Sequence, residues 1–133
     1  MRRNPLTPMS NCPPPAILIV EDEPLIRMNA VEILEELDAE VLEAADADEA
    51  IRALNCHPGV CLLFTDINMP GSMDGIALAA HVHATHPDIG LIVTSGGQNL
   101  KNAQLPDSGT FLPKPYRHQQ LLDLARKKLA SKG

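Results

Sequence analysis

Short apolar runs and helical repeats of apolar residues alternate along this chain from residue 16 onwards. Apolar runs of four to eight residues, bounded by turn formers, are typical of strands buried on both faces of a sheet. The central run, 60–64, leads to Asp66, after which Met69 and Pro70 predict a turn. The segments that we predict as strands are 16–20, 40–44, 60–64, 89–94 and 109–113.

Between the strands, apolar residues recur at the spacing of helices that bury one face. Pro24 suits the first turn of a helix, where its missing N–H is not needed. Asp46 and Glu49 form the capping pattern of a second helix start. Asp74 and Gly75 open a third predicted helix. The inward positions predicted for the four helices are Ile26, Ala30, Ile33, Leu34 and Leu37, then Ala50, Ile51 and Leu54, then Leu78, Ala79 and Val82, and lastly Leu121, Leu122, Ala125 and Leu129.

This alternation predicts an α/β fold with a parallel sheet, right-handed crossovers and helices on both faces. Pro113 cannot donate a ladder hydrogen bond, so we expect the fifth strand at a sheet edge. Residues 1–15 hold five prolines without periodicity and predict a disordered tail before a domain at 16–131.

Composition excludes several classes of protein. The chain has 133 residues, 44% of them apolar, but no apolar stretch near eighteen residues, so we predict one domain that does not span a membrane. No secretory signal is visible at the amino end. A net charge of −6 argues against a nucleic-acid partner. Cys12, Cys56 and Cys61 match no zinc spacing and are expected as reduced thiols of a cytoplasmic protein.

Polar residues follow four of the predicted strands. Glu21 and Asp22 come after the first and Asp66 after the third, while Ser95 and Lys114 follow the fourth and fifth. Singly, each has an ordinary explanation as a turn residue, a helix-start acid or a solvated lysine. Parallel strands, however, bring all their carboxyl ends to one edge, where open α/β sheets bind ligands. The combination therefore favours a functional site.

The chemistry of this set indicates a metal and a phosphoryl group. Three close carboxylates would have raised pKa values unless a cation were present. Mg²⁺ favours one or two carboxylates together with phosphate oxygens. Lys114 supplies a point charge for a phosphoryl group or for ionised Asp66. The Ser95 hydroxyl can donate a hydrogen bond to a phosphoryl oxygen.

These motifs resemble those of a receiver domain of a two-component response regulator, the family of the chemotaxis response regulator. The resemblance covers about residues 16–130. The motifs that carry it are the acidic pair in Ile19-Val20-Glu21-Asp22, the phosphoacceptor loop Thr65-Asp66-Ile67-Asn68-Met69-Pro70, the switch hydroxyl in Thr94-Ser95-Gly96 and the lysine motif Leu112-Pro113-Lys114-Pro115-Tyr116.

The resemblance implies a doubly wound, flavodoxin-like sheet with strand order 2-1-3-4-5. It also implies that Asp66 accepts a phosphoryl group from a phosphohistidine, assisted by Lys114 and Ser95. The ligands it implies for Mg²⁺ are Asp22, Asp66 and the main-chain carbonyl of Asn68, with Glu21 acting through water. A cis Lys114–Pro115 bond and Phe111 as the aromatic that follows the state of Ser95 complete the expectation.

Three features depart from the family pattern. The loop from Met69 to Gly75 is one residue longer than usual. Ser95 is assigned as the switch hydroxyl because Gly96 then fills the small-residue position, with Thr94 as the alternative. Only 13 residues, 97–109, lie between the switch region and the fifth strand, so the helix there is expected to be short or irregular. That puts the family's usual dimer surface in doubt.

We therefore expect a stand-alone phosphoacceptor of bacterial histidine–aspartate signalling rather than an enzyme with turnover. It would receive its phosphoryl group from a sensor histidine kinase or phosphotransfer protein and act by docking to a downstream protein. The alternative is a receiver-like module that binds partners without phosphorylation. An aspartyl-phosphate phosphatase would need a second acid where Asn68 stands. Outward Met28 and Val31, with Leu25 beside them and the loop at Pro115 and Tyr116, mark the expected kinase-docking face.

Overall fold

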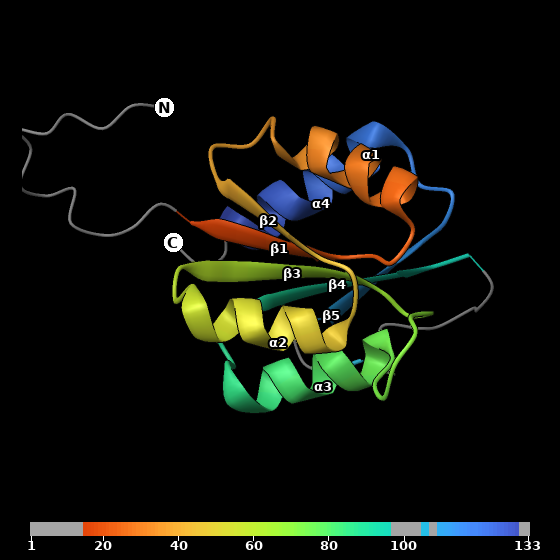
Figure 1. The fold of residues 1–133 in the computed structure, drawn as a ribbon. Coiled ribbons are helices and arrows are strands. Elements are labelled where there is room, and N and C mark those ends of the chain that lie inside the picture. Colours follow the sequence, from red (N-terminus) through yellow and green to blue (C-terminus); the bar gives the residue numbers. More distant parts are fainter. Residues whose placement is uncertain (1–14, 97–104, 107–108, 131–133) are drawn as a thin grey trace, which may run out of the picture.

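Five parallel strands form a single sheet in the order β2-β1-β3-β4-β5. The computed structural model describes residues 15–96, 105–106 and 109–130, and Figure 1 draws the others as a thin grey trace. This strand order confirms the doubly wound, flavodoxin-like expectation. The strands are β1 (Ala16–Val20), β2 (Glu40–Ala44), β3 (Val60–Asp66), β4 (Gly90–Ser95) and β5 (Gly109–Pro113).

Helices cover both faces of this sheet. Figure 1 shows α1 and α4 on one face and α2 and α3 on the other. Within the described residues, no helix is long and apolar enough to cross a membrane. The expected tail, apart from Pro15, and most of the segment 97–109, where a short or irregular helix was expected, lie outside the described residues. The helices are α1 (Pro24–Leu34), α2 (Ala47–Cys56), α3 (Gly75–Thr85) and α4 (His118–Ala130).

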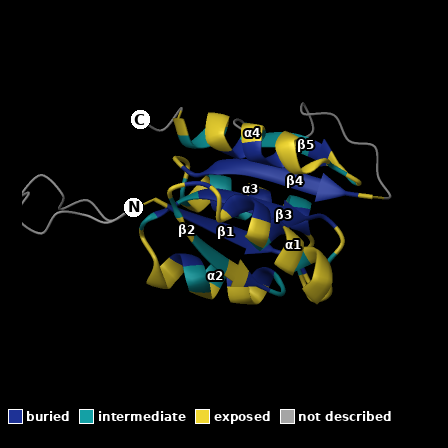
Figure 2. Ribbon diagram, turned by 90° about the horizontal axis from the view of Figure 1, so that it is seen from above, coloured by how far each residue is buried: buried dark blue, intermediate teal, exposed yellow. Residues whose placement is uncertain are grey.

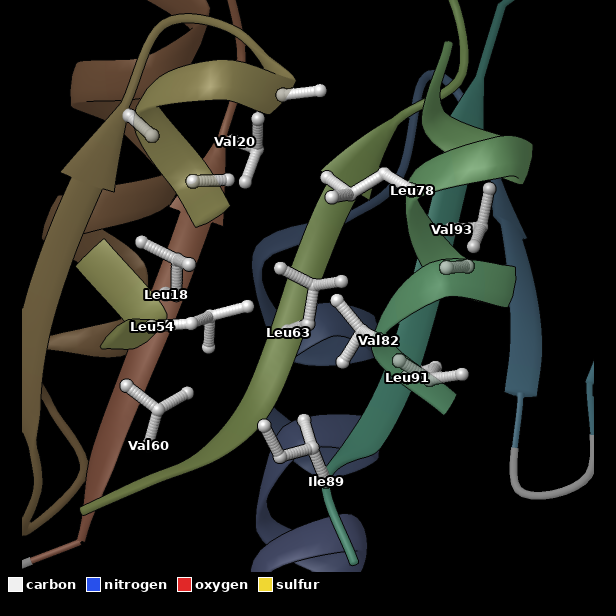
Figure 3. Packing of buried hydrophobic residues seen from close by; sticks show 14 of the residues in the cluster. Leu18, Val20, Leu54, Val60, Leu63, Leu78, Val82, Ile89, Leu91 and Val93 are labelled. Atoms are coloured by element: carbon white, nitrogen blue, oxygen red, sulfur yellow. The ribbon is translucent and has the colours of Figure 1, made fainter. Parts of the chain in front are cut away.

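The core consists of two apolar layers, one on each face of the sheet. Because successive side chains of a strand point to opposite faces, Leu18 packs under α2 and α3 while Ile17 and Ile19 pack under α1 and α4. Figure 3 shows Leu63 and Val82 in the first layer. The inner strands β1, β3 and β4 are covered on both faces, as their dark colour in Figure 2 shows. Their carboxyl ends are consequently held in fixed positions.

Local sequence signals account for the helix starts. The Asp46 carboxylate caps α2 by accepting from the N–H of Glu49 at 2.9 Å. The Glu49 side chain reaches back as in a capping box, but accepts from the N–H of Ala45, the residue before the cap, at 2.8 Å. Asp74 caps α3 by accepting from the N–H of Ala77 at 2.9 Å. Pro24 begins α1, as predicted.

Two helix positions were predicted wrongly. Ile26, expected inward, is 37% exposed, because the first turn of α1 lies at the carboxyl edge of the sheet beside an open groove. Val31, expected outward, is partly buried against the layer under α1 and α4. Leu25 and Met28 are exposed as expected, and β5 lies at a sheet edge as Pro113 indicated.

Candidate functional site

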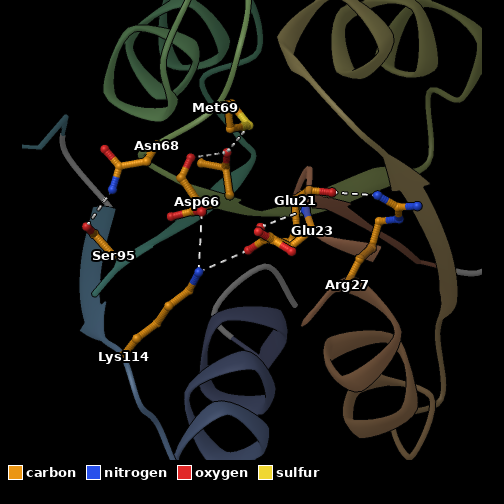
Figure 4. Close-up of polar contacts among 9 residues, drawn as sticks. Glu21, Glu23, Arg27, Asp66, Asn68, Met69, Ser95 and Lys114 are labelled. Atoms are coloured by element: carbon orange, nitrogen blue, oxygen red, sulfur yellow. Dashed lines mark hydrogen bonds and ion pairs between the residues drawn. The ribbon is translucent and has the colours of Figure 1, made fainter. Parts of the chain in front are cut away.

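Asp66 ends the central strand of the sheet and is the middle of the polar cluster drawn in Figure 4. Strand β3 lies between β1 and β4, with Asp66 opposite Thr94 in the register. This position between two covered strands leaves Asp66 only 5% exposed, although it carries a carboxylate. A buried carboxylate needs a charged partner or a ligand to offset its desolvation.

Lys114 reaches across the strand ends to two carboxylates (Figure 4). Its Nζ lies 3.1 Å from Oε1 of Glu21 and 3.3 Å from Oδ2 of Asp66. Burial alone would lower the pKa of Lys114, but the hydrogen bond to Glu21 and the charges of Asp66 and Glu21 outweigh it and raise the pKa. Lys114 is therefore a fixed positive charge shared between the first and third strand ends.

The lysine motif is anchored on both sides of its charged residue. The N–H of Lys114 donates to the carbonyl of Ser95 at 3.0 Å, and the expected cis Lys114–Pro115 bond is present. The Tyr116 ring packs edge-to-face on Phe64, with ring centroids 5.8 Å apart. Burial, with added effects of the Glu21 and Asp66 charges, raises the pKa of Tyr116 to about 12.

Glu21 is buried and lies against Lys114 rather than facing solvent. Its Oε2 accepts from the N–H of Glu23 at 3.2 Å. Burial raises the pKa of Glu21, and the charge of Asp66 adds to this, whereas the contacts with Glu23 and Lys114 oppose it. The repulsion between carboxylates that the sequence predicted thus contributes to the raised pKa of Glu21, but desolvation contributes more.

Glu21, Asp22 and Asp66 could hold a metal ion together. One carboxylate oxygen from each lies within 4.8 Å of the others. Asp22 is exposed, which leaves room for water on that side. Oδ1 of Asp66 is buried and has no hydrogen-bond partner among the described residues. Hard oxygen donors with an open, unpaired acceptor are the donor set that fits Mg²⁺.

Asn68 connects the loop after β3 to the end of β4. Its Nδ2 donates to Oγ of Ser95 at 3.2 Å. The Thr94 hydroxyl is also buried, but it has no hydrogen-bond partner among the described residues. Of the two candidate switch hydroxyls, Ser95 is the one that contacts the Asp66 loop. Phe111, in β5, is partly buried against the layer under α2 and α3.

Gly75 is a residue whose importance sequence reasoning missed. Its N–H donates to the carbonyl of Ile67 at 2.9 Å, and a Cβ here would lie 2.0 Å from the carbonyl oxygen of Asp66. Only glycine therefore allows α3 to begin directly against the Asp66 loop. The Asp-Gly pair was a signal for a helix start, but the close approach depends on two segments nine positions apart in the chain.

Comparisons with known proteins agree with this geometry. The family model described as "Response regulator receiver domain" matches residues 17–126. The solved receiver domain of NtrX from Brucella abortus is 31% identical, with a TM-score of 0.76 over 86% of this chain and 98% of that one. A CheY-like receiver domain protein from Methanospirillum hungatei is 28% identical, with a TM-score of 0.78 over 90% and 97% of the two chains.

The curated relatives are longer proteins. The sensor kinase CckA of Brucella abortus is 36% identical over 85% of this chain, which corresponds to 12% of that kinase. The transcriptional regulatory protein PdtaR of Mycobacterium tuberculosis is 31% identical over 89% of this chain and 58% of its own length. This chain thus spans less than two thirds of these relatives.

Proposed function

The chain belongs to the response regulator receiver domain family, and on that premise we propose that Asp66 accepts a phosphoryl group from a phosphohistidine. Receiver domains are generally non-enzymatic phosphoacceptors that interact with histidine kinases or phosphotransfer proteins, and they generally bind Mg²⁺ at an acidic pocket. The proposed donor is a sensor histidine kinase or a phosphotransfer protein of bacterial, cytoplasmic signalling. The result is a phosphorylated domain that docks to a downstream protein.

The transfer follows from the contacts of the site. A carboxylate oxygen of Asp66 forms a bond to phosphorus while the bond from phosphorus to the imidazole nitrogen breaks and its electron pair stays on the ring. Lys114, already 3.3 Å from Asp66, holds a phosphoryl oxygen electrostatically. The Ser95 hydroxyl donates to another. Bound Mg²⁺, held by Asp22, Asp66 and the main-chain carbonyl of Asn68, would neutralise charge on the transferring oxygens.

The observation that carries this proposal is the uneven surroundings of the Asp66 carboxylate. Oδ2 is paired with Lys114, while the buried Oδ1 has no hydrogen-bond partner among the described residues. A carboxylate with a purely structural role would have both oxygens paired, because leaving one buried and unpaired costs roughly 1–3 kcal/mol. The open oxygen fits a nucleophile or a metal ligand.

Intact mass measurement after incubation with acetyl phosphate and Mg²⁺ tests the proposal. The wild type should gain the mass of one phosphoryl group, and Asp66→Asn should gain none. Asp123→Asn is the matched control, because Asp123 is exposed on α4 and pairs there with Arg126 and Gln119. Undiminished labelling of Asp66→Asn would refute the assignment. An unlabelled wild type would favour a module that binds partners without phosphorylation.

The docking face for the phosphohistidine donor is proposed beside Lys114. A groove of about 320 Å³ opens there, between α1 and the loop before α4. Leu25, 78% exposed, borders it, and Met28, 55% exposed, continues the apolar surface along α1. Exposed apolar side chains beside a polar site are typical of partner surfaces. The residues that line the groove are Leu25, Ile26, Asn29, Lys114, Pro115 and Tyr116.

Charged substitutions test this face. Leu25→Asp and Met28→Asp should each slow transfer from a phosphorylated histidine kinase roughly tenfold, as loss of an apolar interface anchor does, and leave labelling by acetyl phosphate nearly intact. Ala80→Asp on α3 is the control, because Ala80 is exposed on the opposite face of the sheet. If neither Leu25→Asp nor Met28→Asp slowed kinase transfer, the donor would dock elsewhere.

A further inference from the structure

Arg27 connects three elements around the acidic pair. Its Nη1 donates to the main-chain carbonyl of Glu21 at 2.6 Å, and its Nε lies 3.1 Å from Oε1 of Glu43. Arg27 belongs to α1, Glu43 to β2, and Glu21 follows β1. Figure 4 shows the guanidinium on the side of Glu21 away from Lys114. We propose that Arg27 is a positioning residue that fixes the backbone between Glu21 and Asp22, and thereby places Asp22 for Mg²⁺.

The carbonyl of Glu21 belongs to the peptide that joins it to Asp22. Since a peptide unit is planar, holding its oxygen also fixes the direction of the following N–H and Cα. Asp22 is exposed, so its carboxylate is placed by its backbone and not by packing. The orientation of this peptide therefore sets the position from which the Asp22 side chain reaches toward the carboxylates of Glu21 and Asp66, whose oxygens lie within 4.8 Å of its own.

Other contacts hold the rest of Glu21. The N–H of Glu21 donates to the carbonyl of Ala44 at 3.0 Å, which fixes the peptide before it. The Glu21 side chain is held by Lys114 and by the N–H of Glu23. Arg27 holds the carbonyl of Glu21, which belongs to the next peptide, the one that joins Glu21 to Asp22. Groups that orient metal ligands commonly change affinity about 10–100-fold when removed.

The guanidinium suits this role better than an ammonium would. Two acceptors in different directions, a main-chain carbonyl and a carboxylate, are reached by two nitrogens of one rigid planar group. Glu43 orients that group from β2, where it pairs with Ile19 in the register. A lysine at this position would keep the charge and lose one of the two contacts. A loss of Mg²⁺ affinity in Arg27→Lys would therefore come from the lost contact and not from a lost positive charge.

This inference rests on the proposed function only for its Mg²⁺ readout, so two measurements are needed. The first is Mg²⁺ affinity by titration calorimetry, without a phosphodonor. Arg27→Ala and Arg27→Lys should weaken binding about tenfold, and Glu43→Gln less, because its amide oxygen still accepts. The second is the amide NMR resonance of Asp22 in metal-free protein, which should move in both Arg27 variants. Arg126→Ala, which removes an arginine paired with Asp123 on α4, should change neither.

The outcomes separate this inference from the proposed function. Unchanged Mg²⁺ affinity, within twofold, in both Arg27 variants would overturn the positioning role, as would an unmoved Asp22 resonance. If Arg27→Ala did not fold, Arg27→Lys and Glu43→Gln would still decide the matter. Saturating Mg²⁺ should restore most of the labelling rate of the Arg27 variants, since the nucleophile is intact. A wild type that bound Mg²⁺ but took no phosphoryl group would refute the proposed function and leave the role of Arg27 standing.

Discussion

Replacing Gly75 by alanine should destabilise the protein and disturb the Asp66 loop together. The added Cβ would lie 2.0 Å from the Asp66 carbonyl oxygen, 2.7 Å from its carbonyl carbon and 2.8 Å from Cα of Ile67. All three are backbone atoms, so no side chain can rotate away to make room. The start of α3 or the end of β3 would have to move.

The magnitude follows from the size of this overlap. The shortest contact, 2.0 Å, is 1.4 Å below the 3.4 Å at which ordinary contact begins. Forcing an extra carbon into a packed site typically costs about 1–3 kcal/mol, and a backbone clash belongs at the upper end. Alanine recovers roughly 0.4–1 kcal/mol by restricting the unfolded chain. The expected loss in the free energy of unfolding is therefore about 2 kcal/mol, or roughly 8 °C in Tm.

Urea unfolding and thermal melting measure the loss, and the labelling assay measures its effect on Asp66. Gly90→Ala is the matched control, because a Cβ there would lie 3.5 Å from Leu62 Cδ1 in ordinary contact. Gly90→Ala should stay within about 1 kcal/mol of the wild type, and only Gly75→Ala should also label more slowly. Wild-type stability and labelling in Gly75→Ala would show that α3 can move away from the Asp66 loop without cost, contrary to the predicted clash.

Three further outcomes are expected. Asp22→Ala should weaken Mg²⁺ binding severely, because a direct ligand is lost, and Glu21→Ala should weaken it less, because Glu21 is a partner held by Lys114. Equal Mg²⁺ affinities of the two variants by calorimetry would contradict this. Thr94→Val should leave labelling unchanged and stability within about 1 kcal/mol, because its hydroxyl is buried without a partner among the described residues. Ser95→Ala should slow labelling, and the reverse ranking would move the switch to Thr94. Asp46→Ala should lower the free energy of unfolding by about 1 kcal/mol in urea, because it removes the cap of α2.

The sequence by itself determined the strands, the parallel sheet and the edge where the polar residues gather. Short apolar runs bounded by turn formers and apolar repeats at helical spacing are local signals, and each can be recognised without knowing what packs against it. Since parallel strands share one carboxyl edge, the order of elements was enough to predict that Asp66 and Lys114 would meet. The starts of α1, α2 and α3 were equally local, because Pro24, Asp46 and Asp74 act on their own helix.

Only the tertiary structure decided how the polar residues are paired. Lys114 lies against Glu21, 93 positions earlier in the chain, as well as against Asp66. The rotation of α1 about its axis depends on α4 and on the open groove, so Ile26 was wrongly expected inside. The close approach at Gly75 and the hydrogen bond from the Arg27 side chain to the Glu21 carbonyl both involve main-chain atoms of a second segment. A pattern of side-chain types carries no information about such contacts, because they depend on distances that packing sets.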